Sequence, residues 1–221
     1  MDAIPGEAKQ KFGVHSCPFV VQKQAMPGLI CVYCSSSDSL DQKYYDEAAR
    51  LARQLVAHGW GLVYGGGNRG AMGVVGRTVK EAGGRVVGII PEFMKTRELA
   101  LDAADELITV PTMHERKHRM EQRADGFVAL PGGIGTLEEL VEVMTLRYLN
   151  QMHKPIILVN QEGFYDELLR FFDRMTREKF KSAGLHDLFN VVGTVDEIWR
   201  HLADPKPFTA DELWREPRTA R

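Results

Sequence analysis

Seven short apolar runs, separated by stretches long enough to form helices, constrain the fold of this chain more than any other feature. The runs read LICVYCS, GLVYGGG, RVVGII, ELITV, GFVAL, PIILVN and NVVG. Unbroken Val, Ile and Leu runs are typical of strands that are buried on both faces of a sheet. The stretches between them predict helices at Gln42–His58, Ala71–Ala82, His114–Ala124, Thr136–Asn150, Tyr165–Phe180 and Val195–Ala203. The alternation predicts an α/β fold, a Rossmann-like doubly wound parallel sheet with helices on both faces.

The length of the chain fits a single domain of this kind. Its 221 residues, of which 44% are hydrophobic, provide enough apolar side chains for one sizeable core. The first 26 residues are polar, and the last stretch mixes prolines with charges. We therefore expect an N-terminal tail at 1–26, one domain at 27–204 and a C-terminal tail at 205–221.

Charge and hydropathy argue against two classes of partner. Twenty-eight basic and thirty acidic side chains nearly balance, whereas proteins that bind nucleic acids or membrane surfaces carry basic clusters. No apolar run approaches the roughly 20 residues of a membrane-spanning helix, and the N-terminus lacks the apolar core of a secretory signal. We therefore expect no nucleic-acid partner, no membrane partner and a cytoplasmic location.

The three cysteines do not form a disulfide framework. Cys31 and Cys34 spell a C-x-x-C within the first apolar run, and Cys17 lies upstream. On a strand, side chains three residues apart point to opposite faces and their Cα atoms are about 10 Å apart, which excludes a disulfide. The redox reading of this motif would require a helix that starts at Cys31.

Two glycine-rich loops follow predicted strands and lead directly into predicted helices. One contains Gly65, Gly66 and Gly67, and the other contains Gly132, Gly133 and Gly135. Glycine lets a ligand oxygen approach the backbone amides, and a helix N-terminus adds unpaired donors and partial positive charge, so a phosphate fits such a loop. Neither loop has the G-x-G-x-x-G or Walker pattern, which favours a mononucleotide over NAD or a P-loop triphosphate. The alternative is that the glycines only close tight turns.

Glu139 has two possible roles. Thr136 and Glu139 match a capping box, in which the glutamate bonds back to the first backbone amide of the helix. A catalytic role would instead place this carboxylate beside the sugar of a nucleotide, where it stabilises positive charge at the anomeric carbon. Glutamine also serves in a capping box, so a Glu139→Gln change separates the two roles.

The segment His114–His118 spells H-E-x-x-H, a zinc motif when it lies on a helix. Arg116, Lys117 and Arg119 argue against it because cations repel a dication, and no third ligand occurs at a family spacing. A solvated charged helix is one alternative. Another is that Arg116 and Lys117 face a cleft and bind an anion.

The motifs MHERK, at Met113–Lys117, and PGGIGTLEE, at Pro131–Glu139, are separated by one predicted helix and one predicted strand. Together with VYCSSS, YGGGNRGAMG, GIIP, REL and MHKPIILVN, they resemble the blocks of the LOG (LONELY GUY) family of cytokinin riboside 5′-monophosphate phosphoribohydrolases, in the same order. The resemblance runs from about Leu29 to about Ala203. The usual CGSS of the family is CSSS here, with Ser35 in place of a glycine.

The resemblance implies hydrolysis of the N-glycosidic bond of an N6-modified adenosine 5′-monophosphate, which yields the free base and ribose 5-phosphate. It implies Arg116 and Glu139 as the catalytic pair and a homodimer, and we expect neither a cofactor nor a metal. Together with the glycine loops, it leads us to expect substrate contacts at Gly66, Gly67, Glu98, Met113, Lys117, Gly132, Gly133, Ile134, Gly135, Thr136, Leu137, Glu138 and Thr145.

Two other functions remain open from the sequence. An AMP nucleosidase of broader specificity would have the same phosphate loop, because the base pocket alone selects an N6-substituent. A non-catalytic nucleotide carrier, like the molybdenum-cofactor carrier proteins, would have a similar fold and glycine loop, although the Arg116 and Glu139 pair argues against it. An older label for such sequences, lysine decarboxylase, has no support from a lysine placed for a pyridoxal phosphate Schiff base.

Overall fold

A computed structural model of the chain describes residues 28–95, 101, 103–180 and 185–205. It contains a seven-stranded, all-parallel sheet, and every strand coincides with one of the predicted apolar runs, the third strand extending one residue past its run, to Pro91. This confirms the predicted α/β class. The expected tails lie outside the described residues, apart from 205. The strands are β1 (Leu29–Tyr33), β2 (Gly61–Tyr64), β3 (Val86–Pro91), β4 (Glu106–Val110), β5 (Gly126–Ala129), β6 (Ile156–Val159) and β7 (Asn190–Val192).

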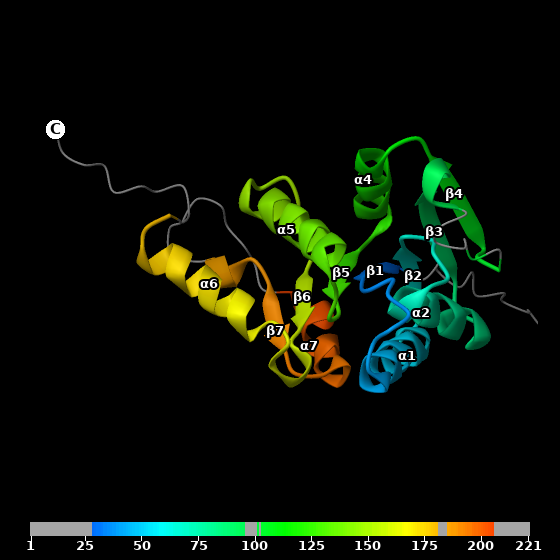
Figure 1. Cartoon of the computed structure of the whole chain (residues 1–221), viewed down its shortest axis with the longest axis horizontal. Coiled ribbons are helices and arrows are strands. Elements are labelled where there is room, and N and C mark those ends of the chain that lie inside the picture. Colours follow the sequence, from blue (N-terminus) through cyan, green and yellow to red (C-terminus); the bar gives the residue numbers. More distant parts are fainter. Residues whose placement is uncertain (1–27, 96–100, 102, 181–184, 206–221) are drawn as a thin grey trace, which may run out of the picture.

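Helices cover both faces of the sheet (Figure 1), as predicted for a doubly wound fold. The core on one face packs against α4 (Met113–Arg123), α5 (Ile134–Tyr148) and α6 (Asp166–Arg177). The core on the other face packs against α1 (Gln42–Ala57), α2 (Gly70–Glu81) and α7 (Ile198–Ala203). The helix predicted at 195–203 is divided, because a short 3-10 turn at Val195–Glu197 precedes α7.

The strands divide their side chains between the two cores. On β1, Leu29, Cys31 and Tyr33 belong to one core, and Ile30 and Val32 belong to the other. This alternation follows from the two-residue period of a strand, and the unbroken apolar run follows because both faces are buried.

The same alternation keeps the thiols of Cys31 and Cys34 on opposite faces of the sheet. Cys31 lies in the core beneath α4 and α5, whereas Cys34 packs against the core of the opposite face. Both are free thiols, as the spacing predicts.

The strand order β4-β3-β2-β1-β5-β6-β7 reverses direction between β1 and β5. The chain runs outward from β1 to β4, returns through α4 to β5, and then runs outward to β7. The loops after β1 and β5 therefore lead to helices on opposite faces and leave a crevice at the carboxyl ends of these strands, where ligands bind in such sheets. None of the helices in the described ranges is both long and apolar enough to cross a lipid bilayer.

Candidate active site

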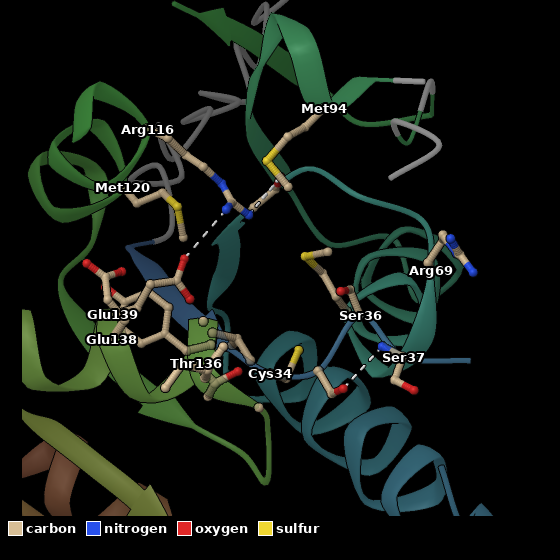
Figure 2. Close-up of a pocket in the computed structure, with 18 of the residues that line it drawn as sticks. Cys34, Ser36, Ser37, Arg69, Met94, Arg116, Met120, Thr136, Glu138 and Glu139 are labelled. Atoms are coloured by element: carbon tan, nitrogen blue, oxygen red, sulfur yellow. Dashed lines mark hydrogen bonds and ion pairs between the residues drawn. The ribbon is translucent and has the colours of Figure 1, made fainter. Parts of the chain in front are cut away.

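A cavity of about 480 Å³ lies at this reversal point. Loops from four strand ends and the first turns of α4 and α5 surround it (Figure 2). Its described lining is Val32, Tyr33, Cys34, Ser35, Ser36, Ser37, Gly65, Arg69, Met72, Met94, Met113, Arg116, Met120, Gly133, Ile134, Gly135, Thr136, Glu138 and Glu139. The cavity therefore brings together the second glycine loop and both residues of the expected catalytic pair.

The N-terminus of α5 opens into this cavity without a capping side chain. The helix begins at Ile134, its N-cap is Gly133, and no side chain bonds to its first amides. Thr136 is thus the third residue of the helix, and the predicted capping box between Thr136 and Glu139 is wrong. The helix starts earlier because Gly133 takes the extended conformation of an N-cap and its carbonyl accepts the amide of Leu137. The first amides of α5 are left as donors for an anion.

The loop before α5 is held in place by two hydroxyl side chains. Tyr165 donates a hydrogen bond of 2.8 Å to the carbonyl of Leu130. Thr136 packs over Gly132 so closely that a Cβ at position 132 would lie 2.2 Å from its Oγ1. A glycine is therefore required at 132 for packing, and the loop is fixed before any ligand arrives.

The first glycine loop does not offer the same site. The Asp38 carboxylate accepts a hydrogen bond of 2.8 Å from the Gly70 amide at the start of α2 and forms an ion pair with Arg69. These two interactions lower the pKa of Asp38, so it is an anion at neutral pH. Gly66 and Gly67 are buried and lie outside the described cavity lining, where Gly65 is found instead. A protein carboxylate thus occupies the position at α2 that a phosphate would take.

Arg116 points from the first turn of α4 into the cavity (Figure 2) and is 8% exposed. Its Nε donates to the carbonyl of Ile89 at 3.2 Å, and its Nη2 donates to the carbonyl of Gly65 at 3.3 Å. A Cβ at position 65 would lie 1.7 Å from Nη2, so only glycine leaves room for the guanidinium. The ends of β2 and β3 therefore fix the orientation of this cation.

Glu139 faces Arg116 across the cavity. Its Oε1 lies 3.8 Å from Nη1 of Arg116, and its side chain is 11% exposed. Burial raises the pKa of Glu139 to about 7, although the charge of Arg116 acts in the opposite direction. The pair is therefore a rigid guanidinium opposite a carboxyl group that titrates near neutral pH, which is common among catalytic groups.

Other residues expected to contact substrate lie elsewhere. Lys117 turns its ammonium toward Glu138 and Glu142 of α5 and lies outside the described lining. Leu137 and Thr145 line a separate apolar groove between α5 and α6. Glu98 lies outside the described residues. Their roles as substrate contacts stay predictions.

The H-E-x-x-H segment lies on α4, as predicted, but its two histidines are exposed. His114 and His118 face solvent, and a ring nitrogen of His118 lies 2.9 Å from the amide nitrogen of Gln122. Within the ranges that the structure describes, no three His, Cys, Asp or Glu residues are grouped to hold a metal ion. Arg116 is the residue of this segment that reaches the cavity, which agrees with the anion-binding alternative.

Part of the cavity wall was not predicted from the sequence. Arg69 had no assigned role, although it lies two residues after the first glycine loop, where a ligand was expected. Ser35, Ser36 and Ser37, which follow β1 and line the cavity, had no role beyond their part in the family resemblance. Four methionines also line the cavity, and nothing in their sequence spacing connects them: Met72, Met94, Met113 and Met120.

Gly135→Ala is expected to stabilise the ligand-free protein but weaken phosphate binding. Gly135 is in the first turn of α5, its φ is not positive, and a Cβ there meets no atom within 4 Å. Alanine in a helix is favoured over glycine by about 0.5–1 kcal/mol. The same methyl group stands where a phosphate would approach the amides, so we expect the Kd for AMP to rise about tenfold or more.

Thermal unfolding and isothermal titration calorimetry measure these two effects. Adenosine, which lacks the phosphate, serves as the control ligand, and its affinity should change much less. An equal loss of affinity for AMP and adenosine would contradict phosphate binding at this helix.

The fold resembles those of solved molybdenum-cofactor proteins. The molybdenum cofactor carrier protein from Chlamydomonas reinhardtii superposes with a TM-score of 0.62 at 23% identity, over 80% of this chain and 96% of that chain. The molybdenum cofactor binding protein from Rippkaea orientalis gives 0.57 at 24% identity, over 77% and 91%. At these identities the likeness establishes the fold alone.

Sequence comparisons identify closer relatives. A family model described as "Possible lysine decarboxylase" matches residues 72–202. Cytokinin riboside 5′-monophosphate phosphoribohydrolase LOG2 of Arabidopsis thaliana is 48% identical over 154 residues, which are 70% of this chain and 72% of the relative. Probable cytokinin riboside 5′-monophosphate phosphoribohydrolase LOGL5 of Oryza sativa subsp. japonica is 42% identical over 186 residues, 83% and 76% of the two chains. Identity at this level over more than two thirds of the chain shows that this protein belongs to the LOG family.

Proposed function

We propose that this protein hydrolyses the N-glycosidic bond of an N6-modified adenosine 5′-monophosphate, a cytokinin riboside monophosphate, to the free base and ribose 5-phosphate. The observation that carries the proposal is the buried Arg116 and Glu139 pair, 3.8 Å apart, in a cavity that the uncapped N-terminus of α5 enters. The relatives at 48% and 42% identity are named for this activity. The protein is thus an N-glycosyl hydrolase in this proposal.

The phosphate binds at the start of α5 in this mechanism. The amides of Ile134, Gly135 and Thr136 point along the helix axis without intrahelical acceptors, and the partial positive charge of the helix adds to their attraction for an anion. Glu139 lies one turn further along the same helix. A nucleotide held by its phosphate at this loop therefore has its ribose near that carboxylate.

Bond cleavage separates charge between the two sides of the pair. The C1′–N9 bond breaks, its electron pair goes to the base, and water provides the hydroxyl group for the sugar and a proton for the base. Positive charge on the ribose is stabilised by ionised Glu139, and negative charge on the base or phosphate is stabilised by Arg116. Because protonation removes the negative charge of Glu139, kcat/KM should fall below pH about 7.

The methionines support a substrate with an apolar group on N6. Figure 2 shows Met94 across the cavity from Thr136, at the end away from the phosphate loop. Met113 is close to Arg116 as well, with its sulfur 3.9 Å from Nη1. Methionine side chains are flexible and apolar, and they adapt to irregular apolar ligands.

Met94→Ala is expected to reduce the preference for an N6-modified substrate. The variant removes apolar contact from the base end of the cavity, so kcat/KM for isopentenyladenosine monophosphate should fall by about tenfold. The value for plain AMP should stay within about twofold of wild type. The matched control is Phe93→Ala, which changes an exposed neighbour outside the described lining. Equal losses for both substrates would show that Met94 does not contact the N6 group.

The decarboxylase label of the family model fits this cavity poorly. A pyridoxal phosphate enzyme needs a lysine in the site to form the Schiff base. The lining that the structure describes contains Arg69 and Arg116 but no lysine. The residues present therefore do not fit that cofactor.

Incubation with isopentenyladenosine monophosphate and with AMP, in parallel, tests the proposal. Free base and ribose 5-phosphate are measured for each nucleotide. Release from the modified nucleotide at a higher kcat/KM supports the proposed activity, whereas equal release from both indicates an AMP nucleosidase of broader specificity. Binding without release of either product would indicate a nucleotide carrier.

We propose further that the protein is a homodimer. An apolar groove of about 460 Å³ runs between α5 and α6, and its lining includes partly exposed Val141, Leu149 and Phe171. Apolar patches of this kind are typical of protein interfaces. Sedimentation velocity should give twice the chain mass of 24.9 kDa, and a monomer would contradict the proposal.

A cytoplasmic location is also proposed. Cys31 and Cys34 are free thiols, which persist in a reducing compartment. Cell fractionation measures the location directly, and recovery of the protein outside the cytoplasm would contradict this proposal.

A further inference from the structure

Lys117 follows Arg116 on α4, and its ammonium lies between two carboxylates of α5. Its Nζ contacts Oε1 of Glu138 and lies 3.0 Å from Oε2 of Glu142. The Lys117 side chain is only 13% exposed. Oε2 of Glu142 is buried and lacks a hydrogen bond within the described ranges, so this ammonium is its nearest compensating charge. The contact therefore links two helices at a partly buried position.

This link lies beside the expected catalytic pair. Arg116 and Lys117 are adjacent on α4, and Glu138 and Glu139 are adjacent on α5. Arg116 meets Glu139 inside the cavity. Lys117 and Glu142 lie outside the described lining, whereas Glu138, which Lys117 also contacts, belongs to it. A shift of α4 relative to α5 would change both contacts together.

We propose that Lys117 is a positioning residue: its ammonium, held between Glu138 and Glu142, offsets these two carboxylates beside the expected catalytic pair and so keeps a charged Glu139 facing Arg116. This role differs from the direct substrate contact expected from the family motif. It rests on the proposed hydrolase function, because its readout is the rate of base release.

The same contact contributes to the electrostatic environment of Glu139. Burial is the largest cause that raises the pKa of Glu139, Arg116 lowers it, Glu138 and Glu142 raise it, and Lys117 lowers it. Removal of Lys117 leaves two carboxylates without their cation and favours protonation of Glu139. Removal of the charge of Glu142 has the opposite effect.

Groups on β1 do not compete with these charges near neutral pH. Cys31 and Tyr33 lie beneath Glu139, and burial raises the pKa of each well above its ordinary value, so both are neutral. Cys34, just after β1, is neutral for the same reason. Lys117 itself remains charged, because Glu138 and Glu142 together outweigh the burial that would lower its pKa.

The test compares two variants that break the same ion pair, Lys117→Met and Glu142→Gln. The pH profile of kcat/KM for isopentenyladenosine monophosphate is measured for each. For Lys117→Met we expect a rate about three- to tenfold below wild type at pH 6, recovering to within about twofold at pH 8.5. For Glu142→Gln we expect the acid limb of the profile, where kcat/KM falls as the pH decreases, to move to lower pH. The double variant should return the limb close to its wild-type position.

One further variant tests which group's protonation produces the acid limb of the pH profile, and another serves as a distant control. Burial raises the pKa of Glu121 to about 7 as well, but Glu121 is outside the described cavity lining. Glu121→Gln should therefore leave the limb in place. Lys80→Met breaks a distant ion pair, with Asp105, and should give the wild-type profile. Circular dichroism verifies that each variant is folded.

Opposite shifts from Lys117→Met and Glu142→Gln support the proposal. The same loss from both at every pH would overturn it, because that result reports loss of a structural contact alone. A pH-independent rise in KM from Lys117→Met, with a wild-type profile for Glu142→Gln, would overturn it in favour of a direct substrate contact. The wild-type protein is assayed before any variant. If it releases no base from isopentenyladenosine monophosphate or from AMP, the hydrolase proposal itself fails.

Discussion

Replacing Glu139 with glutamine is expected to lower turnover by about a hundred- to a thousandfold and to leave the fold intact. Glutamine fills almost the same volume but has no charge to stabilise the ribose as the glycosidic bond breaks. The residue does not cap α5, whose N-cap is Gly133, so the helix loses no capping interaction. Single-turnover release of base, with circular dichroism as the folding control, measures both expectations.

Stability gives an independent readout of the same substitution. The pKa of Glu139 is raised in the folded state, so its contribution to stability is present at low pH and is lost as the pH rises through about 7. Glutamine does not ionise, and the change in melting temperature should therefore be more favourable at pH 8 than at pH 5. The matched control is Glu167→Gln, an exposed carboxylate on α6. Full turnover in the Glu139 variant would remove this residue from the mechanism.

Replacing Arg116 with methionine is expected to lower turnover by a similar factor, about a hundred- to a thousandfold. Methionine keeps much of the apolar volume but removes the positive charge opposite Glu139. It also removes the donors to the carbonyls of Ile89 and Gly65. The variant should therefore be less stable than wild type, and its turnover is measured well below its melting temperature.

The pH dependence of the activity that remains in this variant gives a second test. The charge of Arg116 lowers the pKa of Glu139, so its removal should move the acid limb of kcat/KM to higher pH. The control is Arg119→Met, three residues further on the same helix, whose guanidinium is exposed and pairs with Glu115. A wild-type rate for the Arg116 variant would show that the guanidinium has no part in bond cleavage.

Local patterns were sufficient to predict the sheet and the helices. The five inner strands are buried throughout, so their apolar runs are continuous, while the edge strands β4 and β7 are partly exposed. Each run could be recognised without knowledge of its neighbours. The placement of ligand-binding loops at the carboxyl ends of the strands followed from the parallel topology. The boundary of α5 was predicted two residues late, because Thr136 and Glu139 imitate a capping box while Gly133 makes the actual N-cap.

The two glycine loops illustrate a limit of local reasoning. Both have the composition of a phosphate-binding turn, and both lead into a helix. The difference between them is the carboxylate of Asp38, which comes from the loop after another strand and bonds to the start of α2. A side chain that is distant in sequence thus decides which loop is free to bind an anion.

The sequence by itself determined the doubly wound α/β class, the order of strands and helices along the chain, and the kinds of side chain at the site. These depend on periodicity and on residues within a few positions of one another. Only the tertiary structure decided that Arg116 meets Glu139 at 3.8 Å, that Lys117 pairs with Glu138 and Glu142, and that four methionines share one cavity. The reason is physical: these contacts join different helices and loops, and their distances depend on how the elements pack across the sheet, which no local pattern of residues specifies.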